Sequence, residues 1–201
     1  MATTAAPYGL RPINLIGGQV FAGSTRQIKI ASGYAANIFF GDIVAIGTDG
    51  TIVKVTNVGT NADPFPAGTV GVFLGCTYTD PNLKYKLNAQ YWPTGTVAAD
   101  AMAYVCDDPD ALFQIQADDA VTQTMLGSNF GVNQTAGSTA SGNSKVALDV
   151  GTRATTATIG LRLVDFVEGP FSTVGDTYTD CIVKFNAGIH TYNNATGVGD
   201  A

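Results

Sequence analysis

Apolar and polar residues alternate along much of this chain with a period of two, which is the period of a β-strand. The clearest unit combines an apolar run at 39–46, a turn at Asp49-Gly50, a return run at 52–55 and a third run at 70–76. The first run is apolar on both faces, which is typical of a strand covered on both sides. We expect the even-numbered residues of 70–76 to share one face and the odd-numbered residues the other. Asp-Gly predicts a type I′ hairpin turn, because that turn needs positive φ at both central positions.

The pattern predicts further short strands, separated by turns rich in glycine, proline and aspartate. Runs at 101–106 and 111–116 flank the turn formers of 107–110, which predicts a second hairpin. At Val164 the apolar parity of the run 157–168 slips, which predicts a β-bulge. A segment at 120–126 follows two aspartates and predicts a short capped helix, the only one in the chain. The remaining predicted strands lie at 19–30, 145–149 and 180–186. Together these elements predict an all-β fold, an antiparallel sandwich or barrel.

The same pattern divides the chain into three parts. For residues 1–18 we expect an extended N-terminal arm, because their prolines favour extended backbone. Several of these residues are too apolar for a free tail. The arm has two interpretations, an edge segment packed on its own domain or an arm laid on a neighbouring subunit. Residues 19–187 predict a single β domain, with a flexible excursion at 127–145 that is rich in Gly, Ser, Thr and Asn. We expect 188–201, which holds the single histidine His190, to be an exposed tail.

Composition narrows the classes of function. Hydrophobic residues make up 45% of the chain, which is enough for a core, whereas charged residues make up 13%, about half of the usual ~25%. A surface so poor in charge is typical of one that is covered by another chain. The net charge of −6 and the lack of any Lys/Arg run argue against binding of DNA or RNA through phosphates, so we expect no nucleic-acid partner.

The sequence offers no constellation that predicts catalysis. One histidine excludes a multi-histidine metal site and weakens any Ser-His-Asp or Cys-His scheme. A nucleophile elbow, a phosphate loop and a dinucleotide fingerprint are absent. The acids of 107–110 predict a turn, because the glycine and final glutamate of a calcium loop are missing. We therefore expect a non-enzymatic protein with no catalytic residue, no cofactor and no metal.

The cysteines and the apolar runs of the sequence bear on the cellular compartment. Cys76, Cys106 and Cys181 lie in predicted strands without close pairing, so we expect buried free thiols made in a reducing cytosol. The first residues lack the basic and apolar regions of a signal peptide. No apolar run approaches ~18 residues, so we expect no contact with a membrane.

An aromatic stretch at 77–96 is the most distinctive candidate for binding. It includes Tyr85, Tyr91 and Trp92, with lysines on both sides of Tyr85. Such a group predicts core and rim packing, an anchor for a protein interface, or a platform on which a sugar ring stacks. The third interpretation makes the chain a carbohydrate-binding β-sandwich, on a virion or secreted.

Several stretches of the chain together form a pattern found in a known family. They are Ala6-Pro7-Tyr8-Gly9-Leu10-Arg11-Pro12, residues 30–34 running into 38–42, Tyr91-Trp92-Pro93, residues 103–109 and residues 185–190. Together they resemble the cement or decoration proteins of tailed bacteriophages, small structural proteins encoded beside the major capsid protein. The start of a hairpin at Gly41-Asp42 is also similar to the β-tulip decoration proteins, although this chain is longer.

The resemblance implies a mostly β capsid accessory, bound to the outer shell where capsomers meet. Its implied partner is the major capsid protein, with homo-oligomers (dimers or trimers) on the capsid and synthesis in the host bacterial cytoplasm. On this hypothesis the interface comprises residues of the arm and of the aromatic stretch. They are Pro7, Tyr8, Leu10, Arg11, Ile13, Tyr85, Tyr91 and Trp92.

Overall fold

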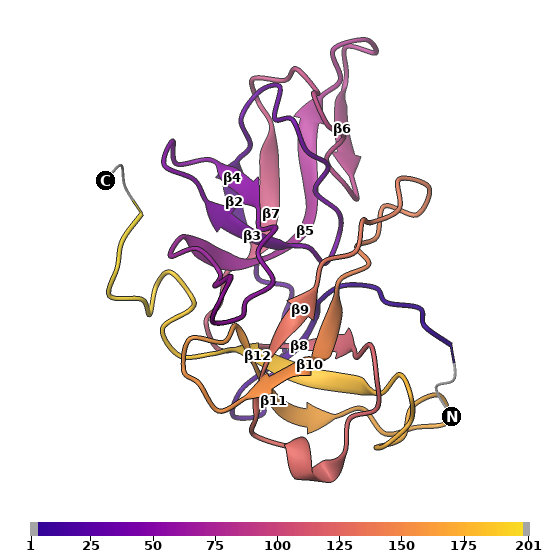
Figure 1. Ribbon diagram of the computed structural model, residues 1–201. Helices are drawn as coiled ribbons and strands as arrows, with labels where there is room; N and C mark the ends of the chain where they lie inside the picture. Colours follow the sequence, from indigo (N-terminus) through magenta and orange to yellow (C-terminus); the bar gives the residue numbers. More distant parts are fainter. Residues whose placement is uncertain (1–3, 199–201) are drawn as a thin grey trace.

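The computed structural model describes residues 4–198 and confirms the all-β fold. Two antiparallel sheets hold the strands, and neither closes into a barrel within the described part of the chain. In the same range the one helical element is a 3₁₀ turn, Gln123–Met125. Figure 1 shows one sheet above the other, and we call them the upper and the lower sheet.

The upper sheet is built from β2 to β7, which follow one another in the sequence. Their spatial order is β2-β7-β5-β3-β4, and β6 pairs with the second half of β5. The strands are β2 Arg26–Lys29, β3 Ile43–Ile46, β4 Ile52–Lys54, β5 Thr69–Thr79, β6 Lys86–Ala89 and β7 Met102–Cys106. The lower sheet has the order β1-β8-β12-β11-β9-β10. Its strands are β1 Arg11–Leu15, β8 Ala111–Gln116, β9 Asn129–Asn133, β10 Ala147–Ala154, β11 Leu161–Phe166 and β12 Asp180–Phe185.

The predicted hairpin between 101–106 and 111–116 is wrong. Both strands exist, but β7 pairs with β2 and β5, whereas β8 pairs with β1 and β12. The acidic turn between them is real. The Asp108 carbonyl accepts the Ala111 N–H at 3.1 Å, and the Asp108 carboxylate accepts the Asp110 N–H at 2.8 Å. This turn carries the chain from the upper to the lower sheet, because a turn signal does not specify the partners of the strands it joins.

The two strands of the central hairpin are confirmed, but the predicted type of its turn is wrong. β3 and β4 pair antiparallel, with Ala45 opposite Val53. Gly50 has φ +74°, but Asp49 does not have positive φ, so the turn is not type I′. The Asp49 carboxylate instead accepts the N–H and the hydroxyl of Thr51.

The two faces of β3 enter different cores, as the run of apolar residues predicted. Ile43 and Ala45 belong to a core that joins both sheets, and Val44 belongs to a second core on the other face of the upper sheet. Phe113, Phe130 and Phe185 of the lower sheet also lie in the first core, which we call the shared core. The upper sheet is therefore covered on both faces.

The prediction that even- and odd-numbered residues of 70–76 lie on opposite faces of β5 is wrong, because two irregularities interrupt the alternation. Register shifts occur beside Val70 on the β3 side and between Phe73 and Cys76 on the β7 side. As a result Val72 faces the shared core, while Val70 and Phe73 face the other one. The bulge expected at Val164 is confirmed by a register shift between Leu163 and Asp165.

Two predictions for the middle of the chain need correction. The excursion 127–145 contains β9, whose Phe130 and Val132 are fully buried, so apolar residues within a glycine-rich stretch suffice for a strand. Its remainder folds back onto the upper sheet, where Ser144 donates to the Phe40 carbonyl at 2.9 Å. The helix predicted at 120–126 is reduced to the 3₁₀ turn, and its N-cap Thr122 makes no side-chain capping bond.

The C-terminal tail is not simply exposed. Ile189 and His190 are buried, and the Thr191 N–H donates to the Thr69 carbonyl of β5 at 2.7 Å. Having left the lower sheet, the chain therefore returns to the upper one. Residues 199–201 of the predicted tail lie outside the described residues.

Candidate functional site

The predicted arm lies on its own chain. β1 is an edge strand of the lower sheet, with Arg11 opposite Gln114. Leu10 is fully buried and joins the shared core, so it is withdrawn as a contact for a partner. Pro7, Tyr8 and Ile13 are half-buried, and Arg11 is exposed. Residues 1–3 of the predicted arm lie outside the described residues.

Tyr8 fastens this segment to the sheet. Its hydroxyl donates to Asp180 at 2.9 Å, and the Arg11 guanidinium lies 4.3 Å from the centre of its ring. Burial, followed by the negative charge of Asp180, raises the pKa of Tyr8 well above its usual range. Burial also raises the pKa of Asp180, although the Tyr8 hydroxyl and Arg11 oppose this rise. The arrangement fits the first interpretation of the arm, an edge segment on its own domain.

The three aromatic candidates lie in different environments. Trp92 is completely buried and packs edge-on against Tyr78 with ring centres 5.2 Å apart, so it cannot contact a partner or a sugar. Tyr91 is half-buried and stacks on Phe39 at 5.5 Å. Tyr85 alone of the three exposes more than half of its surface, 53%. The sugar-stacking platform therefore loses its central ring.

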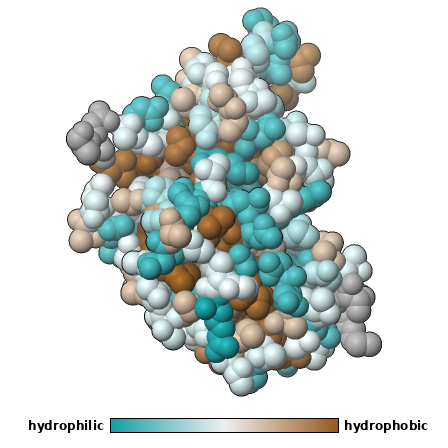
Figure 2. Space-filling view, in the orientation of Figure 1, coloured by the Kyte–Doolittle hydropathy of each residue, from teal (hydrophilic) through white to brown (hydrophobic). Residues whose placement is uncertain are grey.

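Beside Tyr85 the upper sheet presents apolar side chains that the sequence did not single out. The turn between β5 and β6 exposes 57% of Leu83, and a neighbouring loop exposes 66% of Val97. Both this turn and that loop line one surface hollow, which includes Pro81 and Val97. We call Leu83, Tyr85 and Val97 the upper apolar tip; the top of Figure 2 shows hydrophobic and hydrophilic residues mixed there.

Hydrogen bonds within the turn fix the upper apolar tip. The Asp80 carboxylate accepts the N–H groups of Asn82 and Leu83 at 2.7 and 2.8 Å. The Asp80 N–H donates to the Tyr85 carbonyl, and its own carbonyl accepts the Lys84 N–H. Lys84, at φ +61°, is the one non-glycine residue with positive φ in the described part of the chain. The backbone at Leu83 is thus fixed, although most of the surface of this residue meets solvent.

The lower sheet exposes a second apolar group on a tight turn. Phe171, in the connection between β11 and β12, has 83% of its surface exposed. Gly169 and Ser172 exchange backbone hydrogen bonds around it, and the buried Ser172 accepts the Asp180 N–H at 2.9 Å. Phe171 therefore leaves most of its apolar area available for a contact, and we treat it as a candidate contact residue.

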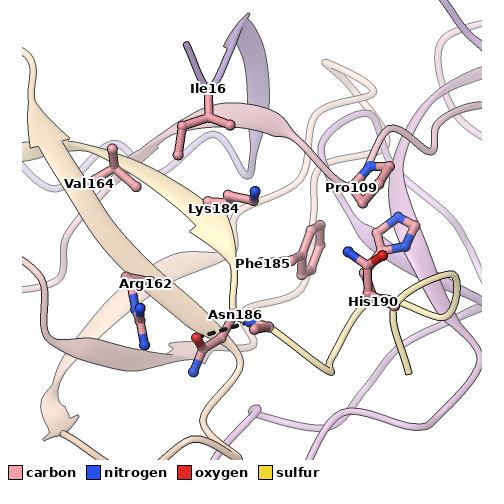
Figure 3. Close-up of a pocket in the computed structure, with 10 residues that line it drawn as sticks. Ile16, Pro109, Arg162, Val164, Lys184, Phe185, Asn186 and His190 are labelled. Atoms are coloured by element: carbon pink, nitrogen blue, oxygen red, sulfur yellow. Dashed lines mark hydrogen bonds between the residues drawn. The ribbon is translucent and has the colours of Figure 1, made fainter. Parts of the chain in front are cut away.

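A cavity of about 220 Å³ opens on the lower sheet where the tail leaves β12. Figure 3 shows side chains from several segments around it, with Lys184 extending toward Pro109 and Arg162 beside Asn186. Lys184 pairs with Asp110 at 2.6 Å, and Arg162 donates from Nε to the Asn129 side chain at 3.0 Å. The cavity thus combines apolar walls with two cationic side chains.

Residue types that carry catalysis are dispersed. Within residues 4–198 no three of the His, Cys, Asp and Glu side chains gather as a metal site would require. Burial raises the pKa of the three cysteine thiols to about 12. The same range contains no helix of the length and hydropathy that a membrane span requires.

Comparisons with known proteins add nothing to the fold and the surfaces described above. Comparison of the chain with protein-family models, with curated proteins and with solved structures finds no match.

Proposed function

We propose that this protein is a capsid cement protein of a tailed bacteriophage, which binds the outer capsid surface between capsomers and stabilises the shell. The observation that supports this function is that both sheets expose large apolar side chains on turns fixed by hydrogen bonds. These are Leu83 on the upper sheet and Phe171 on the lower one. A molecule with a contact on each sheet can bridge two neighbouring subunits. The partner is the major capsid protein.

Adhesion by such a protein needs no catalytic group. A turn whose backbone is already fixed loses little conformational freedom on binding, so more of the area that it buries contributes to affinity. A few residues supply most of the binding energy in a protein interface, and the exposed side chains on these turns are our candidates for that role. Symmetry repeats the contact over the shell, and many modest contacts together give strong attachment.

The interface proposed here modifies the one expected from the resemblance. Tyr85 stays in it and is joined by Leu83 and Val97 of the upper apolar tip. Four residues of the N-terminal segment keep part of their surface accessible and stay as candidates on the lower sheet. They are Pro7, Tyr8, Arg11 and Ile13.

Sedimentation of the purified chain with capsids that lack it tests this function. We expect wild-type protein to sediment with the shells, and Leu83→Asp to raise the half-saturating concentration about tenfold or more, because an interface anchor is replaced by a charge. Val20→Asp is the matched control, since Val20 is 76% exposed but lies outside the upper apolar tip. Wild-type protein that stays in the supernatant at all concentrations would refute the function, and equal binding of both variants would refute the tip as its interface.

A further inference from the structure

The cavity on the lower sheet has the size and the walls of a site for an aromatic ring. Its volume is about 220 Å³, whereas a protein cavity of ~150 Å³ already accommodates benzene. Apolar side chains form much of the wall, among them Ile16, Val164 and Phe185. A single phenylalanine side chain is a suitable occupant on volume and on polarity.

Two cations beside this space indicate that the occupant also carries a negative charge. Arg162 and Lys184 lie directly opposite each other on β11 and β12, and like charges in this position destabilise a sheet. The whole chain has only ten Lys and Arg residues. Asp110 neutralises Lys184 in part but is itself 59% exposed, and the bond that Arg162 makes is to a neutral amide. An incoming carboxylate would relieve the repulsion.

The chain itself presents this combination of groups. Phe171 projects from its tight turn with 83% of its surface exposed. Three residues earlier stands Glu168, which is exposed and forms no ion pair within the described residues. Ser172 anchors the turn through the Asp180 N–H. We call Glu168 to Phe171 the acidic knob.

We propose that the acidic knob of one copy inserts into the lower-sheet cavity of a second copy, so that the protein self-associates through this contact. Phe171 fills the apolar part of the cavity, and Glu168 approaches Lys184 and Arg162. Knob and cavity are different surfaces. Two copies that exchange knobs therefore form an isologous two-fold dimer, and a one-way contact is heterologous and closes when several copies form a ring. This inference concerns the isolated chain and does not depend on capsid binding. On a capsid, Phe171 is available to the shell only in a copy whose knob is not inserted into another copy.

Sedimentation velocity of the full chain, over a series of concentrations up to about 1 mM, tests the contact. We expect wild-type protein to associate and Phe171→Ser to raise the dissociation constant of self-association about tenfold or more. Val20→Ser, which removes another strongly exposed apolar side chain, should associate as wild type does. Added salt should weaken the wild-type association, because one part of the contact is between opposite charges.

Charge reversal identifies the two surfaces. Glu168→Lys and Lys184→Glu should each weaken self-association, and an equimolar mixture should restore it. In the mixture an unaltered knob meets an unaltered cavity, and the altered knob meets a cavity of opposite charge. Ala187→Trp is a second block of the cavity that leaves its charges unchanged, since Ala187 is an exposed residue of the cavity wall. Thermal unfolding of each variant checks that it is folded.

Three outcomes would overturn the proposal. One is a wild-type chain that stays monomeric throughout the concentration series. Another is Phe171→Ser protein that associates as strongly as wild type. The third is a mixture of the two charge-reversal variants that associates no better than either alone. If Phe171→Ser lowered only the binding of a monomeric chain to capsids, the acidic knob would belong to the capsid contact and not to a second copy.

Discussion

His190 is packed between aromatic rings and the upper sheet. Its ring centre lies 6.2 Å from that of Phe185 and 5.0 Å from that of Tyr192. Nδ1 accepts the Tyr192 N–H at 3.3 Å, so the neutral ring carries its proton on Nε2. Burial lowers the pKa of His190, and the backbone at Val70 and the charge of Asp107 oppose this in part. A buried neutral imidazole couples folding to pH.

The free energy of unfolding should fall as pH decreases below about 6.5. The pKa of His190 is lower in the folded protein than in the unfolded chain, so the unfolded chain takes up the proton first. The contribution of His190 is complete above the unfolded pKa and is lost as pH falls toward the folded pKa. Urea unfolding at a series of pH values between about 7.5 and 5.5 measures this loss.

His190→Gln is the control for this pH dependence, because glutamine does not titrate. Asp180 has the opposite sign, since its raised pKa lets the folded protein keep a proton that the unfolded chain releases. The difference between wild type and His190→Gln isolates the histidine. Equal slopes of stability against pH for the two proteins would contradict the assignment.

At the scale of elements, glycines permit the irregularities of β5. Gly71 has φ +148°, and a Cβ built there would lie 1.9 Å from the carbonyl oxygen of Cys106 on β7. No side chain can occupy that space, so β5 and β7 approach each other only because residue 71 is glycine. The irregularity at this point places Val70 and Phe73, which are three residues apart, on the same face of β5, while Val72 faces the shared core.

Gly71→Ala should therefore lower the free energy of unfolding by more than about 3 kcal/mol, because the backbone of β5 must move away from β7. Gly197→Ala is the control, since a Cβ there meets no atom within 4 Å and its φ is not positive. Chemical denaturation of both variants provides the measurement. A loss for Gly71→Ala no larger than that for Gly197→Ala would show that the strands can separate at little cost.

Local pattern predicted where strands lie far better than how they pair. The runs at β3, β4, β7, β8 and β12 were visible because period two and turn residues are local properties. The partners of β7 and β8 were not visible, because pairing depends on contacts between residues distant in sequence. β9 was missed because its glycine-rich surroundings hid two buried apolar residues, Phe130 and Val132.

The candidate surfaces were predicted only in part, for the same reason. Trp92 in the aromatic stretch is in fact a core residue, because Tyr78 and the upper sheet enclose it. Leu83 and Phe171 were overlooked, although an apolar residue inside a turn of Asp, Asn, Gly and Pro was a usable signal. The cavity and the opposition of Arg162 and Lys184 need the register of β11 and β12, which sequence alone did not give.

On the scale of the whole molecule, both chain ends fasten one sheet to the other. β1 precedes the entire upper sheet yet belongs to the lower one, and the tail leaves β12 and returns to β5. Ile189 and Phe185 lie in the shared core together with Ile43 of the upper sheet. The relative position of the sheets thus depends on segments outside them as well as on the shared core.

Deletion of 189–201 should lower the free energy of unfolding by about 2–5 kcal/mol, as expected for loss of a buried aliphatic residue, with further loss from the Thr191–Thr69 hydrogen bond. Deletion of 197–201 is the control, because it leaves Ile189 and His190 in place. Urea unfolding gives the stabilities, and hydrogen exchange should show faster exchange near Thr69. Equal stability of the two truncated chains would mean that the tail is dispensable to the fold.

The position of β1 has a consequence for the order in which the protein acquires its structure. Arg11 pairs with Gln114, so the first strand leaves the ribosome long before its neighbour has been synthesised. During that interval the upper sheet can assemble from consecutive segments, while β1 has no partner strand. Completion of the lower sheet is thereby delayed until synthesis of the carboxyl-terminal half, so β1 is among the last strands to pair although it is synthesised before the upper sheet.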